Sequence, residues 1–284
     1  MQLDAVSAHQ DPLPPRLVVA AVQFAPSTDP STNLATLREH VRTAREQGAR
    51  VVVAPEYSMY AVVRLDARVV GVAEPLTGPF VTGLGDIARE FGVVLVAGTV
   101  EQVASGNDRI HNTVVVLGTD GTLVTRYRKV HLYDAFGHLE SDVVAPGAIE
   151  QPAVFAVEGV TFGIQTCFDL RFPEGIRRVA AAGAHALLLP AQWIPGPTKV
   201  DQWTTLVRAR ALENTVYVVA ADQAAPWGAG SSMIVDPAGA VLSELGTDPA
   251  VTTAGIDLAH LDKVRAVNPS LALRRFAITE REPQ

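Results

Sequence analysis

The stretch Val160–Trp193, "VTFGIQTCFDLRFPEGIRRVAAAGAHALLLPAQW", decides the fold class. An apolar, β-branched run is followed by a short polar segment, a helical pattern and a second apolar run. Pro173 is suited to the first turn of that helix. Two apolar strands joined through a helix are typical of a crossover unit in a sheet buried on both faces. The stretch therefore predicts an α/β fold.

The same alternation extends toward both ends of the chain. A helix is predicted where Leu34, Leu37, Val41 and Ala44 recur at helical spacing, with Gly48 placed to end it. A second helix is predicted over residues 201–214, with Trp203, Leu206, Val207 and Arg210 on one side. Further strands are predicted over residues 16–26, 50–57, 92–101 and 215–222.

Two hairpins accompany these crossover units. One is predicted over residues 111–130 with its turn at Asp120–Gly121, and one over residues 231–245 with its turn at Pro237–Gly239. Hairpins beside crossover units indicate mixed sheets. The two halves of the chain have similar patterns, which favours two sheets packed face to face with helices outside. A single doubly wound sheet is the competing arrangement.

Composition excludes several classes of protein. The 284 residues are 48% hydrophobic and 19% charged, and the net charge of -7 gives no basic footprint for nucleic acid. A single cysteine excludes an internal disulfide framework and fits a reducing compartment. Residues 1–15 are polar and proline-rich, which predicts a flexible tail rather than a signal peptide. No apolar run approaches the ~18 residues of a membrane span, so we expect a cytoplasmic protein without a membrane partner.

Three predicted strands end in reactive side chains, at Glu56, Lys129 and Cys167. Sites in α/β sheets gather beyond the carboxyl ends of strands. A thiol just before a helix N-terminus lies near free N–H groups, which stabilise a thiolate. Taken singly, each residue also has an ordinary interpretation: Cys167 as a small apolar core residue, Glu56 as an exposed loop carboxylate, and Lys129 as a solvated strand edge.

The histidines offer rival schemes. His131, Asp134 and His138 could ligate a metal, although Gly137 interrupts the helical register between them. A Cys–His pair using His111, His131 or His138 is a further alternative. The Gly-rich segment "PWGAGSSM" is not a phosphate-binding fingerprint in the required context.

Three motifs in order resemble the signatures of the nitrilase, or carbon–nitrogen hydrolase, superfamily: "APEY" with Glu56, "YRKVHLYD" with Lys129 and "CFDLRFPE" with Cys167. The segment "FGHLESDVVAPG" resembles the one that carries a second family glutamate, here Glu140. The resemblance implies a four-layer α-β-β-α sandwich of two mixed sheets, with one hydrolase domain over residues 16–266. It also implies a homodimer or higher homo-oligomer and a C-terminal extension, residues 267–284, that could cross the dimer interface.

The resemblance also implies roles for these residues. Cys167 would be the nucleophile, Glu56 the general base, Lys129 the oxyanion stabiliser, and Glu140 would orient the lysine or the leaving group. The N–H of Phe168 would complete the oxyanion site. The chemistry is consistent, because amide cleavage needs a nucleophile, a group that carries the proton and charge stabilisation at the carbonyl oxygen. This scheme requires no metal and no cofactor.

The residues after the cysteine point to a substrate class. "CFDLRFPE" is similar to the omega-amidase and deaminated-glutathione amidase branch, which removes ammonia from small carboxylate-bearing amides. Arg171 could bind the substrate carboxylate, although an ion pair with Asp169 or Glu174 is the favoured interpretation. Trp193 would line the pocket or pack in the core. Two features depart from that branch: Ser231 replaces a histidine, and "PAQWIPGPTK" differs from the usual wording.

We therefore predict a cysteine-dependent amidohydrolase that cleaves a small carboxylate-bearing amide through a thioester and releases ammonia. N-carbamoyl hydrolysis and acyl transfer with the same three residues are enzymatic alternatives. A catalytically silent member that binds a ligand or a partner protein is the alternative from another class.

Overall fold

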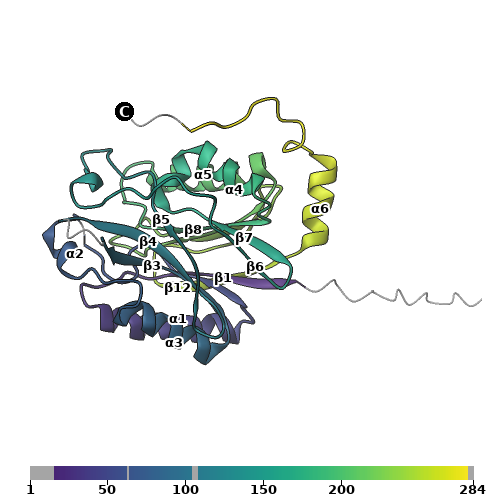
Figure 1. Ribbon diagram of the computed structural model, residues 1–284. Coiled ribbons are helices and arrows are strands. Elements are labelled where there is room, and N and C mark those ends of the chain that lie inside the picture. The colour runs from purple at the N-terminus through teal and green to yellow at the C-terminus, as the bar shows by residue number, and fades with distance from the viewer. Residues whose placement is uncertain (1–15, 63, 104–107, 281–284) are drawn as a thin grey trace, which may run out of the picture.

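The computed structural model describes residues 16–62, 64–103 and 108–280, and it contains two six-stranded sheets packed face to face between layers of helices (Figure 1). The first sheet has the order β12 (Ala250–Ile256), β1 (Leu17–Gln23), β2 (Val51–Val53), β3 (Val94–Gln102), β4 (Ile110–Leu117), β5 (Leu123–Arg128). The second has the order β11 (Val241–Glu244), β10 (Met233–Val235), β9 (Tyr217–Asp222), β8 (Ala186–Ala191), β7 (Val160–Ile164), β6 (Val154–Val157). The predicted sandwich is confirmed, and the competing single sheet is wrong.

Both sheets have the same internal plan. Strands β1, β2 and β3 are parallel, as are β7, β8 and β9, and antiparallel strands flank each set. Both predicted hairpins form, as β4–β5 and β10–β11. The helices are α1 (Pro30–Glu46), α2 (Ala67–Gly71), α3 (Pro79–Phe91), α4 (Pro173–Ala181), α5 (Lys199–Asn214) and α6 (Leu258–Val267). Short 3₁₀ turns cover η1 (Glu140–Asp142) and η2 (Cys167–Arg171).

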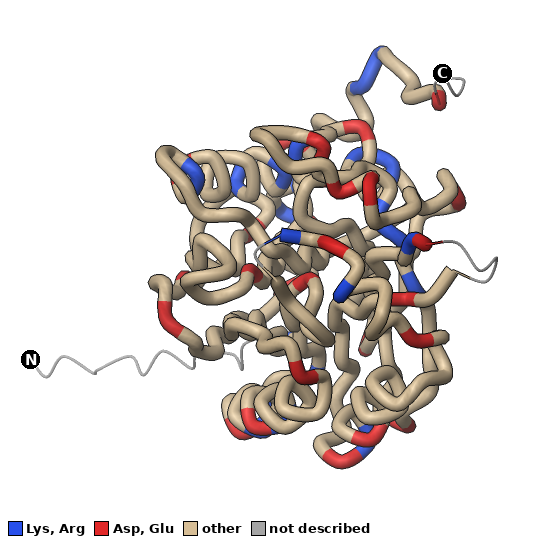
Figure 2. Tube along the Cα trace, turned by 90° about the vertical axis from the view of Figure 1, so that its left-hand side faces the viewer, with Lys and Arg blue, Asp and Glu red and all other residues tan. Residues whose placement is uncertain are grey.

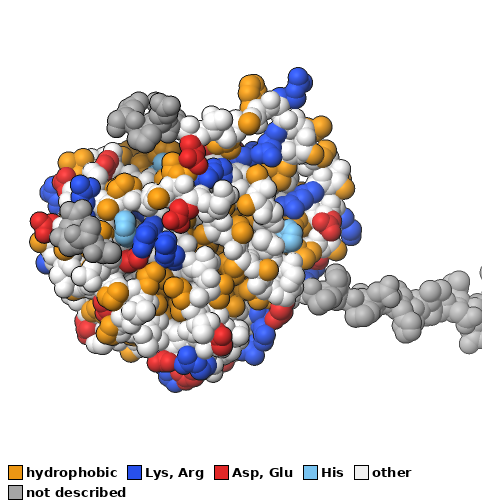
Figure 3. Space-filling model, in the orientation of Figure 1, with side chains coloured by type: hydrophobic (Ala, Val, Ile, Leu, Met, Phe, Trp, Pro, Cys, Tyr) orange, Lys and Arg blue, Asp and Glu red, His pale blue; other side chains and the backbone are white. Residues whose placement is uncertain are grey.

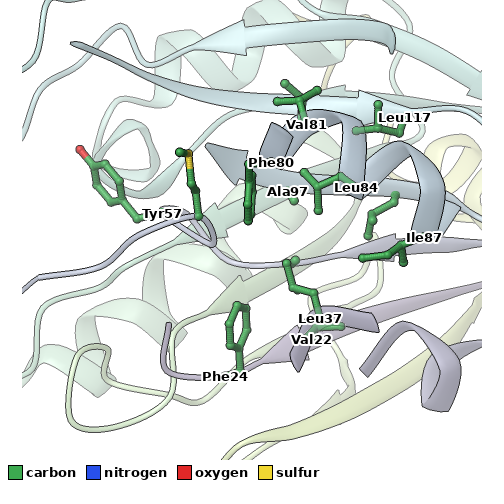
Figure 4. Close-up of a cluster of buried hydrophobic side chains, with 14 of the residues drawn as sticks. Val22, Phe24, Leu37, Tyr57, Phe80, Val81, Leu84, Ile87, Ala97 and Leu117 are labelled. Carbon is green, nitrogen blue, oxygen red and sulfur yellow. The ribbon is translucent and has the colours of Figure 1, made fainter. Parts of the chain in front are cut away.

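Helices α1 and α3 lie side by side on the outer face of the first sheet (Figure 1). Asp29 caps α1 by accepting a hydrogen bond from the N–H of Ser31 at 3.1 Å. The predicted apolar stripe of α1 is buried, and its Leu37 packs with Phe80 and Leu84 of α3 in one cluster (Figure 4). This cluster fixes the first sheet against its helices.

A second core lies between the sheets, where Val53 and Val96 of the first sheet meet Phe162 and Leu188 of the second. A third lies between the second sheet and helices α4 and α5, where Trp203 is fully buried. Three apolar clusters therefore lie between the four layers of helices and sheets. The loops at one end of both sheets are not part of these clusters and can carry a site.

The chain after α6 passes over α4, where Arg178 and Glu280 form an ion pair at 3.3 Å (Figure 1). The predicted boundary between residues 266 and 267 falls at the last residue of α6. The tail predicted over residues 1–15 lies outside the described residues. Acidic and basic positions are interspersed along the described trace (Figure 2), and charged and hydrophobic side chains mix on the face seen in Figure 3. No helix among the described residues is long and apolar enough to cross a bilayer.

Candidate active site

The four residues predicted to act together line one pocket. Glu56 follows β2 and Lys129 follows β5, so both leave the first sheet. Cys167 begins the 3₁₀ turn η2 after β7 of the second sheet, and Glu140 begins η1. The pocket is thus assembled from both sheets, at the end where their central strands finish.

Lys129 is 2% exposed and lies between two buried carboxylates. Its Nζ is 2.9 Å from Glu56 Oε1 and 2.9 Å from Glu140 Oε2. Burial alone lowers the pKa of Lys129, but the negative charges of Glu140 and Glu56 outweigh it and hold the pKa well above its usual value. The ammonium is therefore a permanent positive charge in the pocket.

Glu140 accepts hydrogen bonds on both oxygens. Oε1 accepts from the Tyr57 hydroxyl at 2.8 Å and from Asn112 Nδ2 at 3.1 Å. Oε2 accepts from the N–H of Tyr133 at 2.6 Å and faces Lys129. Burial raises the pKa of Glu140, yet the charge of Lys129 and the hydrogen bonds from Tyr133, Lys129 and Asn112 bring it below its usual value. The lowered pKa keeps Glu140 ionised beside the Lys129 ammonium.

Glu56 joins the two sheets through hydrogen bonds. Its Oε1 accepts from Asn112 Nδ2 at 2.6 Å and from Lys129, and its Oε2 accepts from the N–H of Gln192 at 2.7 Å. Gln192 follows β8, and its carbonyl oxygen accepts from Cys167 Sγ at 3.5 Å. The backbone of Gln192 thus contacts both the Glu56 carboxylate and the Cys167 thiol.

Gly98 allows the Glu56 loop to approach β3. A Cβ at this position would lie 2.6 Å from the Tyr57 nitrogen and 2.7 Å from the Glu56 Cα. Real Cβ atoms do not approach other atoms so closely, so a larger residue would displace this loop. Glycine at position 98 is therefore part of how Glu56 is positioned.

Cys167 has a φ of 45°, which places a non-glycine residue in the left-handed region. The thiol is 5% exposed. Burial raises its pKa well above the usual value, and the negative charge of Glu56 raises it further, while Lys129 acts in the opposite direction. Cys167 begins a 3₁₀ turn and α4 begins only at Pro173, so the thiol does not stand directly before that helix, and burial is the largest cause of its pKa shift.

Phe168 follows Cys167 within the first residues of η2, where backbone N–H groups lack partners inside the turn. Asp169, also in η2, is fully buried and accepts from the Tyr127 hydroxyl at 2.8 Å and from the N–H of Thr166 at 3.1 Å. His131 Nδ1 lies 2.7 Å from the same carboxylate. These contacts hold the turn that presents the thiol.

Arg171 does not form the ion pair that the sequence favoured with Asp169 or Glu174. Its Nη2 donates to Gln202 at 2.6 Å, and its guanidinium lies over the Trp193 ring with Cζ 4.8 Å from the ring centroid. Asp169 is unavailable because other donors surround it. The Trp193 side chain is 3% exposed and packs beside Trp203, so it belongs to the core behind the pocket.

The rival histidine schemes find no support in the geometry. His131 pairs with Asp169, His138 packs against the Tyr133 ring, and Asp134 accepts from the N–H of Ser141. Neither of these histidines, nor His111, which contacts the Ala145 carbonyl, has a hydrogen bond to Cys167 in the part of the chain that is described. No group of three potential metal ligands occurs within residues 16–62, 64–103 and 108–280.

Several residues of the site were not predicted from the sequence. Asn112 bridges both carboxylates, and Tyr57, Tyr133 and Gln192 supply the contacts described above. An asparagine within the apolar run of β4 was a signal that could have been used, because a buried polar side chain needs partners. The Gln192 contact is made by a backbone N–H, which leaves no signature in the sequence.

Comparison with known proteins identifies the family of this chain. The profile of the family described as "Carbon-nitrogen hydrolase" matches residues 18–266. The chain belongs to the carbon–nitrogen hydrolase family. It is 38% identical over 263 residues to the deaminated glutathione amidase of Escherichia coli O157:H7, covering 92% of this chain and 98% of that protein. It is 33% identical over 271 residues to omega-amidase NIT2 of Xenopus tropicalis, covering 90% of this chain and 94% of that protein.

Solved structures of the family have the same fold. A double mutant of the amidase from Nesterenkonia sp. AN1, in complex with acrylamide, superposes with a TM-score of 0.79 at 27% identity, covering 94% of this chain and 97% of that one. Another mutant of that amidase carries the acetamide moiety of fluoroacetamide covalently added at its active-site cysteine. This carbon–nitrogen hydrolase is therefore an enzyme of the amidase type.

Proposed function

We propose that this carbon–nitrogen hydrolase cleaves the C–N bond of a small carboxylate-bearing amide, with Cys167 as nucleophile, and releases ammonia. The observation that carries the proposal is the buried cluster in one pocket, where Lys129 contacts both Glu56 and Glu140 beside the thiol. The covalent adduct at the active-site cysteine of the Nesterenkonia amidase supports the choice of nucleophile.

The raised pKa of Cys167 requires a base, because the buried thiol is protonated near neutral pH. Glu56 takes this proton as sulfur attacks the amide carbon. The developing oxyanion is stabilised by the Lys129 ammonium and by the N–H of Phe168. The C–N bond then breaks, Glu56 returns the proton to the departing nitrogen, and a thioester remains on Cys167.

Water completes the reaction. Glu56 removes a proton from a water molecule that attacks the thioester carbon, and the C–S bond breaks. The proton returns to the thiol, and the carboxylic acid leaves. Glu140 fixes Lys129 throughout, because its oxygens are held by donors from both sides. All steps use residues of this chain.

The test is a panel of small amides, nitriles and N-carbamoyl compounds assayed for ammonia, with intact-protein mass spectrometry for an acyl adduct. Ammonia from amides, together with loss of turnover and adduct in a folded Cys167→Ala variant, supports the proposal. Unchanged turnover in that variant refutes it. Products formed only from carbamoyl compounds would favour that alternative, and neither product nor adduct would favour a silent binding protein.

Two wider expectations belong to the same proposal. The predicted homodimer, with residues 267–284 at its interface, is testable by light scattering of the full chain and of a chain shortened after residue 267. The predicted cytoplasmic location is testable by fractionation of cells that express the protein.

A further inference from the structure

A buried acidic side chain lies behind the catalytic pocket and has no direct part in the proposed chemistry. Asp222 is the last residue of β9 and is fully buried. Its Oδ1 accepts a hydrogen bond from the N–H of Trp193 at 2.7 Å, whereas its Oδ2 has no partner among the residues that the structure describes. Aspartates are almost never buried so deeply unless they are paired, so the contact with Trp193 needs an explanation.

The N–H that Asp222 binds belongs to the segment that follows β8. Gln192 and Trp193 come directly after this strand, whose last residue, Ala191, pairs with Asp222 in the sheet. The carbonyl oxygen of Trp193 accepts from the N–H of Ala229 at 2.8 Å. Asp222 and Ala229 therefore hold the backbone of Trp193 at both its N–H and its carbonyl.

The same segment contacts the two reacting groups of the proposed mechanism through Gln192. Its N–H donates to Glu56 Oε2 at 2.7 Å, and its carbonyl oxygen accepts from Cys167 Sγ at 3.5 Å. The Gln192 carbonyl and the Trp193 N–H belong to one planar peptide group. Asp222 thus binds one end of this peptide group, and the Cys167 thiol binds the other end.

The protonation of Asp222 suits this contact. Burial raises the pKa of Asp222 well above its usual value; the N–H groups of Trp193 and Gln223 act in the opposite direction, and the negative charge of Glu56 raises the pKa. A protonated carboxyl group keeps an oxygen that accepts from the Trp193 N–H. It adds no second negative charge near Glu56, so the acceptor is present without repelling the Glu56 carboxylate.

We propose that Asp222 is a positioning residue of the amide-cleaving site. By accepting from the Trp193 N–H, it sets the orientation of the peptide group between Gln192 and Trp193, so that the carbonyl of this group faces the Cys167 thiol. The Gln192 N–H is thereby placed against Glu56. The inference rests on the proposed function and adds to it a buried residue that acts through the backbone.

The first test measures kcat and KM separately for an amide that the protein hydrolyses. Asp222→Leu removes the acceptor, which should lower kcat by about 10- to 100-fold with little change in KM, because Asp222 does not line the pocket. Asp222→Asn keeps an acceptor oxygen and should restore most of kcat. Asp236→Leu is the matched control, because Asp236 is also buried and accepts from two backbone N–H groups, but in the turn between β10 and β11. It should lose stability and keep the parental kcat.

The second test does not depend on turnover. The chain has one cysteine, so its S–H stretching band in the infrared reports the hydrogen bond of Cys167 alone. The thiol is protonated near neutral pH because its pKa is raised. We expect the band to move to higher frequency in Asp222→Leu, because the hydrogen bond to the Gln192 carbonyl weakens. The band should keep the parental frequency in Asp222→Asn and in Asp236→Leu.

A folded Asp222→Leu protein that keeps either the parental S–H band or the parental kcat overturns the inference, and so does an equal fall of kcat in Asp236→Leu. If Asp222→Leu does not fold, Asp222→Asn decides. A parental band and kcat in that variant support the inference, whereas a shifted band or less than a tenth of the parental kcat overturns it. Absence of ammonia from every amide would instead overturn the proposed function and leave the S–H band to decide on Asp222.

Discussion

Replacing Glu140 with glutamine is the most direct test of the buried charge cluster. Both carboxylate oxygens face donors: the Tyr57 hydroxyl and Asn112 Nδ2 on one side, the N–H of Tyr133 and the Lys129 ammonium on the other. Glutamine has one acceptor oxygen, so its NH₂ must face two of these donors. The backbone N–H and the ammonium cannot turn round to accept, whereas the hydroxyl can.

The expected loss of stability follows from the number of donors that lose an acceptor. With the NH₂ toward Tyr57 and Asn112, the hydroxyl can rotate to accept. Asn112 Nδ2 keeps its hydrogen bond to Glu56 but loses the one to residue 140, which leaves one of its two N–H groups unpaired. An unpaired buried donor costs about 1–3 kcal/mol. Lys129 also loses one of its two countercharges, so we expect Glu140→Gln to lower the free energy of unfolding by about 2–4 kcal/mol. Urea unfolding at pH 7 measures this, with Glu244→Gln at an exposed site as control.

The same substitution should alter the pH dependence of activity. Glu140 is the largest influence that raises the pKa of Lys129, so its loss lowers that pKa. The positive charge needed at the carbonyl oxygen would then disappear at lower pH, and the alkaline limit of kcat/KM should move downward. A change in unfolding free energy below 1 kcal/mol, together with an unmoved alkaline limit, would contradict the role given to Glu140.

Three further predictions follow from the described contacts. The rate at which iodoacetamide alkylates Cys167 should keep rising above pH 9, because the pKa of the thiol is raised. Glu56→Gln should shift this rise to lower pH, because it removes a negative charge that raises the thiol pKa. A rate that reaches a plateau below pH 8 in the parent would refute this. Gly98→Ala should reduce kcat/KM and cost about 1–3 kcal/mol of stability, whereas Gly246→Ala, with nothing within 4 Å of its Cβ, should change neither. Burial raises the pKa of Asp222 well above its usual value. The folded state therefore holds a proton that the unfolded state loses above about pH 4, so the free energy of unfolding falls as pH rises. Urea unfolding at pH 5 and pH 8 should show this fall in the parent relative to Asp222→Asn.

The central strands and their crossovers were predictable because buried parallel strands form apolar runs separated by helical periodicity. The edge strands β6 and β12 were not predicted. Residues of β12 alternate only weakly between buried and half-exposed positions, and β6 is four residues long. Edge strands face less apolar surface, so their sequences carry less of the pattern on which such predictions depend.

Glu56, Lys129 and Cys167 were singled out because each follows a predicted strand, and the resemblance added Glu140. The geometry brings all four residues together. What the sequence could not provide was the electrostatic setting of the thiol. The local pattern around Cys167 predicted a helix N-terminus, which would lower the pKa of the thiol. Burial by residues distant in the sequence raises that pKa instead. The partner of Arg171 was also missed, because Gln202 lies on α5, far along the chain.

The hydrogen bond from the Gln192 N–H to Glu56 has a consequence for how the enzyme forms. Glu56 and Lys129 belong to one half of the chain, and Cys167 and Gln192 belong to the other. Neither half alone contains a complete set of groups. On the proposed mechanism, catalysis therefore requires both halves to be packed together, and turnover would report the final step of folding. Two separately expressed fragments, divided between β5 and β6, would be inactive apart and would gain activity only by finding each other.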